Sequence, residues 1–240
     1  MSGGTIASHR PRRLGAVASL VPTGTRVADV GTDHGILPVI LLARGCATYC
    51  IASELDARTL ARLRSRAADP RLAARLELRS GDGLQALSPR DRIEVVVIAG
   101  LGARTILRIL DEPHRERLGV GRYVLQPQTE WAELRRGLAE RRLRIVEERL
   151  VLERGRFYVV MASVPDSGAG DRRQRGLRPQ DLFEAGPCLA RSADPLVRRF
   201  WSGRLAHQES ILRLARPGPG RDRALRLRDL CGRVLATLPR

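Results

Sequence analysis

The sequence predicts an α/β fold: a doubly wound, Rossmann-like sheet of seven strands, followed by a C-terminal α-helical hairpin. Three observations predict it. An apolar segment at 27–30 runs into a glycine-rich turn and then an apolar helix at 36–44. Strand-like and helix-like segments then alternate as far as residue 140, which is typical of parallel βα units. Two strand-like segments at 145–152 and 157–163 follow with only four residues between them, which indicates a hairpin.

The segments between the first turn and the hairpin justify the sheet element by element. The predicted strands are 48–53, 76–79, 93–99 and 122–126, and the predicted helices are 57–68, the segment ending at 110, and 130–140. The segment 93–99 is strongly apolar, as expected for a central parallel strand that is buried on both faces. Parallel units closed by an antiparallel hairpin favour the methyltransferase variant of this fold over the plain dinucleotide-binding one.

The turn after the first strand indicates the kind of ligand. Its spacing, Gly31-x-x-x-Gly35, differs from the dinucleotide fingerprint G-x-G-x-x-G. Asp33 lies inside the turn and would repel a pyrophosphate. A carboxylate there suits a ligand with a cationic amino-acid head, such as S-adenosylmethionine. A tight turn with no ligand is the alternative.

Acidic and glycine residues follow successive predicted strands, where ligands of doubly wound sheets bind. Glu54 stands about twenty residues beyond the turn, where an acidic side chain commonly accepts both ribose hydroxyls. Asp82 is expected to accept from an adenine amino group and Gly83 to offer its N–H to the ring. A helix-start histidine such as His34 contacts a cofactor less often than it makes a local hydrogen bond. The predicted cofactor-binding residues are Gly31, His34, Gly35, Glu54, Asp82, Gly83 and Gly100.

The charge of the chain points to a polyanionic partner. Its 240 residues hold 43 basic and 26 acidic side chains, a net charge of +17, and every basic one is arginine. Such a field attracts nucleic acid and makes its binding depend on salt. A solvated basic surface on a small-molecule enzyme is the alternative. With only three Phe, two Trp and three Tyr, binding of single strands by aromatic stacking is weakly supported.

The cysteines and the hydropathy of the sequence indicate the cellular compartment. The four cysteines form no C-x-x-C pair and have no neighbouring histidine to complete a zinc site. Reduced thiols in a cytoplasmic protein are expected. We also expect no membrane span, no signal peptide, no metal and a monomer.

The C-terminal part is expected to form a separate unit. Residues 1–164 are predicted to be the catalytic domain, 165–180 a linker and 181–240 the helical hairpin, with helices at 195–216 and 221–238. Apolar residues recur there at helical spacing and are expected to pair: Leu196, Phe200, Ile211 and Leu214 with Leu227, Leu230, Val234 and Leu238.

Several runs of the sequence resemble those of a known family. They are Arg13-Leu-Gly-Ala-Val-Ala-Ser-Leu-Val-Pro22, Ala28-Asp-Val-Gly-Thr-Asp-His-Gly-Ile-Leu-Pro38, Ile51-Ala-Ser-Glu54, Gly81-Asp-Gly-Leu84, Ile98-Ala-Gly-Leu-Gly102 and Leu125-Gln-Pro127. The chain thereby resembles the bacterial tRNA (adenine-N1)-methyltransferases of the TrmK family. The resemblance covers the catalytic domain, with a weaker signal at 183–187 and 200–201.

The resemblance implies transfer of a methyl group from S-adenosylmethionine to N1 of an adenine in the D-loop region of tRNA, position 22 in the family. It also implies substrate contacts at Gln126 and Pro127, tRNA phosphates held by Arg10 and Arg13, and a hairpin whose arginines contact the tRNA body. A solvated arginine cluster and a merely stabilising appendage are the alternatives to these last two roles. The chain departs from the family pattern at Leu101, Ala103 and Gln128, and Ala103 is expected to add a methyl group near the substrate pocket.

The chemistry needs little from the enzyme. N1 of adenine carries an in-plane lone pair, so no covalent nucleophile and no strong base is required. A carboxylate that stabilises the growing positive charge would help. Asp29 is the first candidate for this catalytic role and Asp33 the second, although either can instead hold the cofactor's amino group. The alternatives are a methyltransferase of another RNA or a small molecule, and a non-catalytic RNA-binding protein that retains the cofactor fold.

Overall fold

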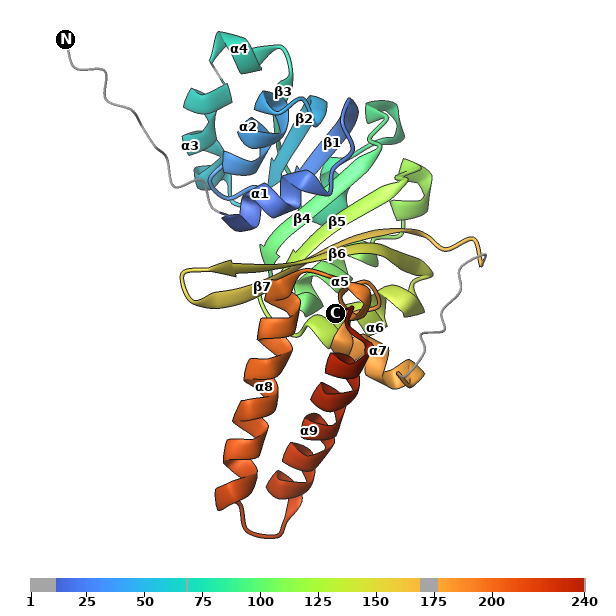
Figure 1. Cartoon of the computed structure of the whole chain (residues 1–240). Helices are drawn as coiled ribbons and strands as arrows, with labels where there is room; N and C mark the ends of the chain where they lie inside the picture. The colour runs from blue at the N-terminus through green and yellow to red at the C-terminus, as the bar shows by residue number, and fades with distance from the viewer. Residues whose placement is uncertain (1–11, 68, 169–176, 240) are drawn as a thin grey trace, which may run out of the picture.

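The computed structural model describes residues 12–67, 69–168 and 177–239. Its strands form one sheet in the order β3-β2-β1-β4-β5-β7-β6 (Figure 1). β7 runs antiparallel to both β5 and β6, and the other pairs are parallel. The strands are β1 (Thr25–Val30), β2 (Ala47–Glu54), β3 (Leu76–Ser80), β4 (Val95–Leu101), β5 (Arg122–Pro127), β6 (Leu143–Glu153) and β7 (Arg156–Pro165). The predicted doubly wound, seven-stranded fold is therefore confirmed.

Helices cover both faces of the sheet. The helices are α1 (Arg12–Ser19), α2 (Ile36–Ala43), α3 (Ala57–Ala67), α4 (Pro70–Ala73), α5 (Ala103–Leu110), α6 (Trp131–Glu140), α7 (Pro179–Ala185), α8 (Pro195–Leu214) and α9 (Pro219–Thr237). β4 shows how the layers are held together. Val95 and Val97 are buried in the core that α1 and α2 share, and Val96 and Ile98 in the core of α5 and α6. Successive side chains of a strand point to opposite faces, so a strand covered twice must be apolar throughout.

Two helices were not predicted and a third begins earlier than predicted, in each case at a proline. Neither α4 nor α7 was predicted, and each begins at a proline, Pro70 or Pro179, in its first turn. α9 begins at Pro219, two residues before the predicted start. Proline is tolerated at the first helical position because the N–H that it lacks has no intrahelical partner there. Arg10 lies outside the described residues.

α8 and α9 pack against each other as the predicted hairpin, and its base is part of the main core (Figure 1). Trp201 and Val234 are fully buried there, and Phe200 packs its ring against Phe157 of β7 and Trp131 of α6. One expectation is wrong. Leu214 is 87% exposed and Ile211 37% exposed, because both lie near the free end of α8, beyond the sheet. The division into domains stays a prediction.

Candidate active site

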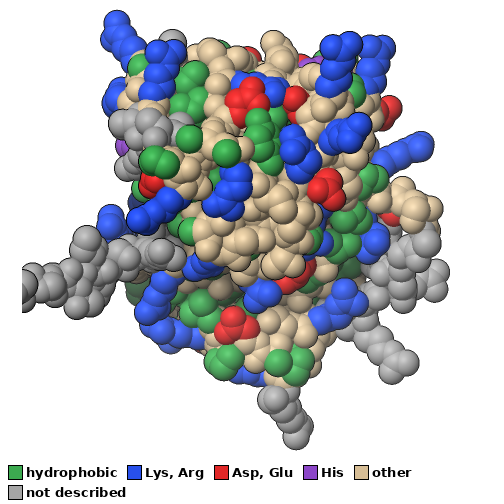
Figure 2. Space-filling view, turned by 90° about the horizontal axis from the view of Figure 1, so that it is seen from above, with side chains coloured by type: hydrophobic (Ala, Val, Ile, Leu, Met, Phe, Trp, Pro, Cys, Tyr) green, Lys and Arg blue, Asp and Glu red, His purple; other side chains and the backbone are tan. Residues whose placement is uncertain are grey.

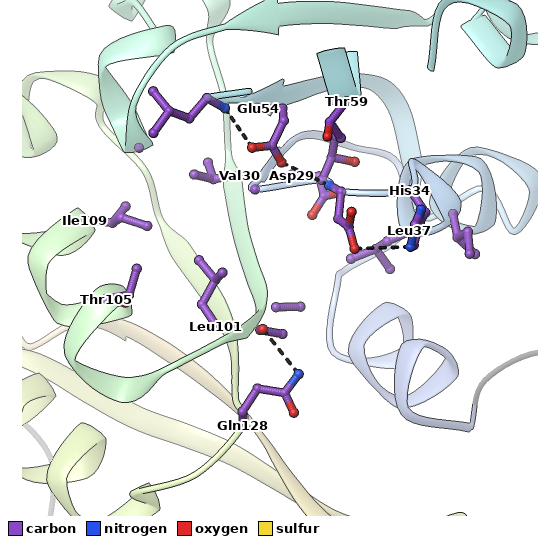
Figure 3. Close-up of a pocket in the computed structure, with 18 of the residues that line it drawn as sticks. Asp29, Val30, His34, Leu37, Glu54, Thr59, Leu101, Thr105, Ile109 and Gln128 are labelled. Atoms are coloured by element: carbon purple, nitrogen blue, oxygen red, sulfur yellow. Dashed lines mark hydrogen bonds and ion pairs between the residues drawn. The ribbon is translucent and has the colours of Figure 1, made fainter. Parts of the chain in front are cut away.

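The carboxyl ends of β1, β2, β3 and β4 surround a cavity of about 510 Å³ (Figure 3). Residues predicted from the sequence supply much of its lining: Arg13, Asp29, Gly31, Asp33, His34, Glu54, Asp82, Gly83 and Gly100. Parallel strands end at the same edge of the sheet, which is why residues far apart in the chain meet here.

The turn from β1 to α2 needs its glycines for different reasons. Gly31 and Gly35 both have positive φ, 75° and 61°, which favours glycine. Gly31 lines the cavity, and its N–H donates to the carbonyl of Ser53 at 2.9 Å, which fixes the turn to β2. Gly35 does not line the cavity. A Cβ there would lie 2.9 Å from a methyl carbon of Leu63, so this glycine permits helix packing.

Asp29 is the buried carboxyl of the site. It lies at the end of β1 and is 3% exposed. Its pKa is raised to about 7, chiefly by burial and to a smaller extent by the charge of Glu54, while the nearby Thr32 side chain acts in the opposite direction. Near neutral pH this group therefore exists in both protonation states. A carboxyl tuned in this way inside a cleft is a candidate for a functional role.

Glu54 and Asp33 are linked through the backbone. The Glu54 carboxylate accepts the N–H of Leu55 at 2.8 Å and the N–H of Asp33 at 3.2 Å (Figure 3). The side chain of Asp33 points away from this bond and pairs with the His34 ring, its carboxylate 3.4 Å from Nε2. Asp33 itself has a positive φ of 44°, which holds its exposed carboxylate at the cavity rim. Glu54 is thus fixed in place, while Asp33 and His34 remain accessible.

Asp82 lies on the opposite wall, next to a cation that was not predicted from the sequence. The Arg108 guanidinium donates to both carboxylate oxygens of Asp82, at 3.1 and 3.3 Å. Thr105, Arg108 and Ile109 of α5 all line the cavity. Their i, i+3, i+4 spacing places them on one helix face, a signal in the sequence that could have revealed them. Leu55, which is 65% exposed, adds an apolar side chain to the lining.

The end of β4 forms the remaining wall. Gln128 Nε2 donates to the carbonyl of Gly100 at 3.2 Å, and Arg13 and Leu101 complete this part of the lining (Figure 3). Gln126 and Pro127 are buried and do not line the cavity. The Gln126 side chain accepts from the Arg13 guanidinium and donates to the carbonyl of Pro127. Direct contact of these two residues with a substrate stays a prediction that the geometry does not favour.

The expectation for Ala103 is wrong. Its methyl group is fully buried in the core under α5 and does not line the cavity. The N-terminus of α5 turns this position toward the sheet, so an alanine here fills the core and leaves the pocket unchanged.

Two classes of feature are not found in the described residues. None of their helices is long and apolar enough to cross a membrane. They also contain no group of three His, Cys, Asp or Glu side chains that could hold a metal ion.

Comparisons with known proteins agree with this geometry. Residues 11–161 match the model of the family described as "Methyltransferase domain". A tRNA (adenine(22)-N(1))-methyltransferase of Bacillus subtilis is 28% identical over 83% of each chain. The crystal structure of the B. subtilis m1A22 tRNA methyltransferase TrmK is 26% identical and superposes with a TM-score of 0.76, over 94% of this chain and 98% of that one.

A candidate tRNA (m1A22) methyltransferase of Streptococcus pneumoniae, solved with S-adenosyl-L-methionine, is 28% identical. It superposes with a TM-score of 0.78 over 93% of this chain and 98% of that one. The resemblance to the TrmK family is thereby confirmed. With its family model matched over more than half its length, the chain belongs to the methyltransferase-domain family.

Proposed function

We propose that this protein transfers a methyl group from S-adenosylmethionine to N1 of adenine 22 in tRNA. One observation carries the proposal: the acidic residues that end β1, β2 and β3 line a single cavity, in a chain that matches tRNA adenine-N1 methyltransferases over most of its length. A tRNA substrate would place the working protein in the cytoplasm.

The cavity has groups that suit each part of this cofactor. Glu54, held by backbone N–H groups, offers its carboxylate to the ribose hydroxyls. Asp82 and the N–H of Gly83 suit the adenine edge, and Leu55 suits its apolar face. Asp29 or Asp33 would hold the cationic amino group of the methionine part. When bound, the cofactor supplies an electrophilic methyl group on a sulfonium.

The protein's own contribution is orientation and electrostatics. The lone pair of adenine N1 attacks without prior loss of a proton, so the enzyme must align this atom, exclude water and tolerate a cationic base. An ionised Asp29 places negative charge within the cavity, and Asp33 does so at the rim. Either carboxylate can accept a hydrogen bond from the adenine amino group, which becomes a better donor as positive charge develops.

The substrate enters past Arg13, Leu101 and Gln128. These side chains line the cavity wall where α1, the end of β4 and the residue after β5 meet. Gln128 is held by Gly100 and presents an amide at this wall. The adenine to be methylated would lie between this wall and the cofactor.

The helical hairpin would bind the body of the tRNA. Its exposed arginines are Arg198, Arg199, Arg213, Arg216, Arg223 and Arg226. Blue side chains also outnumber red ones in Figure 2, which views the molecule from the end away from the hairpin, so positive charge is not confined to the hairpin. Contacts of arginine with phosphates position a nucleic acid without reading its sequence, which leaves the choice of base to the cavity.

Methyl transfer from labelled S-adenosylmethionine to unmodified tRNA, with mass spectrometry of the digested nucleosides, tests the proposal. N1-methyladenosine is the expected product. A different methylated nucleoside would support methyl transfer to tRNA but contradict adenine N1 as the target. Cofactor binding without transfer to any tRNA would favour another substrate.

A further inference from the structure

The turn that joins β6 to β7 contains an arginine where the backbone favours other residues. Glu153 pairs with Arg156, and the two residues between them, Arg154 and Gly155, have φ of 49° and 76°. Two consecutive residues with positive φ make a type I′ turn, in which asparagine, aspartate or glycine is preferred at the first position. Arg154 therefore occupies its position at a cost in stability. Residues retained in strained backbone often serve a function.

The strand pairing places this turn beyond the edge of the sheet that carries the cavity. Leu125 of β5 pairs with Met161 of β7. β5 continues only two residues further, to Pro127, whereas β7 begins five residues before Met161, at Arg156. The ribbon thus extends about 10 Å past the end of β5, at ~3.4 Å per residue. In Figure 1 it projects past α1 on the side where β4 ends.

The turn is also tied to the cavity wall. The Glu153 carboxylate accepts the backbone N–H of Arg13 at 3.1 Å and lies 3.9 Å from its guanidinium. The same guanidinium lies 5.6 Å from the ring centre of Tyr158, on β7, and lines the cavity. α1, the turn and the cavity wall are therefore held together as one unit.

Three arginines on this unit are exposed and unneutralised: Arg12, Arg154 and Arg156, here named the turn patch. Within the described part of the chain, no acidic side chain pairs with any of them. The two arginines that line the cavity each lie close to a carboxylate, Arg108 to Asp82 and Arg13 to Glu153. An unpaired cluster beside a substrate entrance is suited to an external anion. Arginine binds phosphate oxygens through two N–H groups at once.

We propose that the turn patch binds the backbone phosphates of the RNA strand that flanks the base held in the cavity. This inference rests on the proposed function and adds a second RNA contact, separate from the helical hairpin. The turn extends past the end of β5 and is bonded to Arg13, which lines the cavity, so a strand whose base is inserted there would pass close to the turn. Arg154 then keeps its unfavourable position because its charge is needed at that point.

The test exploits the turn geometry. Arg154→Asn places a preferred residue at the I′ position, so thermal stability is expected to be unchanged or raised. The Kd for tRNA, measured by fluorescence anisotropy, is expected to rise about threefold or more. The slope of log Kd against log salt is expected to fall by about one for each phosphate that the variant no longer binds. Arg156→Gln should likewise raise the Kd for tRNA and reduce the salt slope. Neither variant should change the Kd for the cofactor.

A matched control lies at the other end of β6. Arg142 is also exposed and has a positive φ of 54°. Arg142→Asn therefore makes the same change of charge and residue type at the edge remote from the cavity, and should leave the Kd for tRNA unchanged. The turn patch is contradicted if Arg154→Asn and Arg156→Gln bind tRNA like Arg142→Asn. If the wild type binds tRNA without methylating it, the proposed function fails and the affinities still test the patch. A wild type that binds no tRNA overturns both.

Discussion

Arg135 of α6 and Glu148 of β6 form an ion pair inside the protein, with Nε and Oε1 2.7 Å apart and both side chains buried. The same guanidinium donates to the carbonyls of Phe183 and Glu184, and the carboxylate accepts the N–H of Cys188. The end of α7 and the loop that follows it are thus attached to the sheet through one pair of charges. This attachment adds to the apolar packing that holds the base of the hairpin in the main core.

Loss of one partner of this pair should unfold the protein more easily. We expect Arg135→Met to lower the free energy of unfolding by about 3–5 kcal/mol, because it leaves a carboxylate buried without its counter-charge. Denaturant unfolding measures this. Arg122 and Glu147, at 3.2 Å and partly exposed, provide the control. Glu147→Gln should cost no more than about 1 kcal/mol. Equal losses in the two variants would contradict the account.

Asp29 should make stability depend on pH in a defined direction. Its pKa is about 7 in the folded protein and about 3.9 when unfolded. The folded state binds the extra proton, so this contribution to stability is complete below the unfolded pKa and is lost as pH rises through the folded one. Asp29→Asn removes the titration. As the pH rises from about 4 to about 8, the free energy of unfolding of the variant should therefore increase by up to about 4 kcal/mol relative to that of the wild type.

Urea unfolding of both proteins at several pH values measures this difference. Asp33→Asn is the control, since the Asp33 side chain is 72% exposed. The change with pH should be larger for Asp29→Asn than for this exposed position, because burial of Asp29 is the main cause of its raised pKa. If the difference in the free energy of unfolding between Asp29→Asn and the wild type stayed constant across this pH range, the raised pKa of Asp29 would be contradicted.

Asp82→Ala should weaken cofactor binding by about tenfold, the loss of one charge-assisted hydrogen bond. The fold should hardly change, because Asp82 lies at the cavity surface and not in the core. Isothermal calorimetry gives the Kd for S-adenosylmethionine. Asp111, which pairs with Arg141 at the far end of α5, supplies a control. If Asp111→Ala and Asp82→Ala bound the cofactor equally well, Asp82 would not belong to the site.

Neutralising the helical hairpin should weaken tRNA binding without unfolding the protein. Arg213, Arg223 and Arg226 are exposed and far from Trp201 at the buried base. We expect the triple Gln variant to raise the KM for tRNA and reduce its salt dependence, with kcat unchanged. Deleting the hairpin would be a poorer test, because it exposes the core around Trp201. Wild-type KM and salt dependence in the triple variant would exclude the hairpin as a tRNA contact.

Local sequence signals predicted the sheet and the cavity well. The carboxylates at 29, 54 and 82 meet because parallel strands end at one edge, so their place in the chain determined their place in space. Packing decided the rest. Ala103 faces the core, Gln126 lies behind the wall, and Leu214 reaches past the sheet. The Arg135–Glu148 pair joins residues on two elements whose contact no local pattern reveals.

The central claim is methylation of one nitrogen of one base. The most direct measurement compares two tRNA transcripts, one with adenine 22 and one with guanine at that position, using labelled S-adenosylmethionine and mass spectrometry of RNase fragments. The account predicts N1-methyladenosine in the D-loop fragment of the first transcript and no methyl group in the second. Equal labelling of both transcripts, or a methyl group in another fragment, would contradict it.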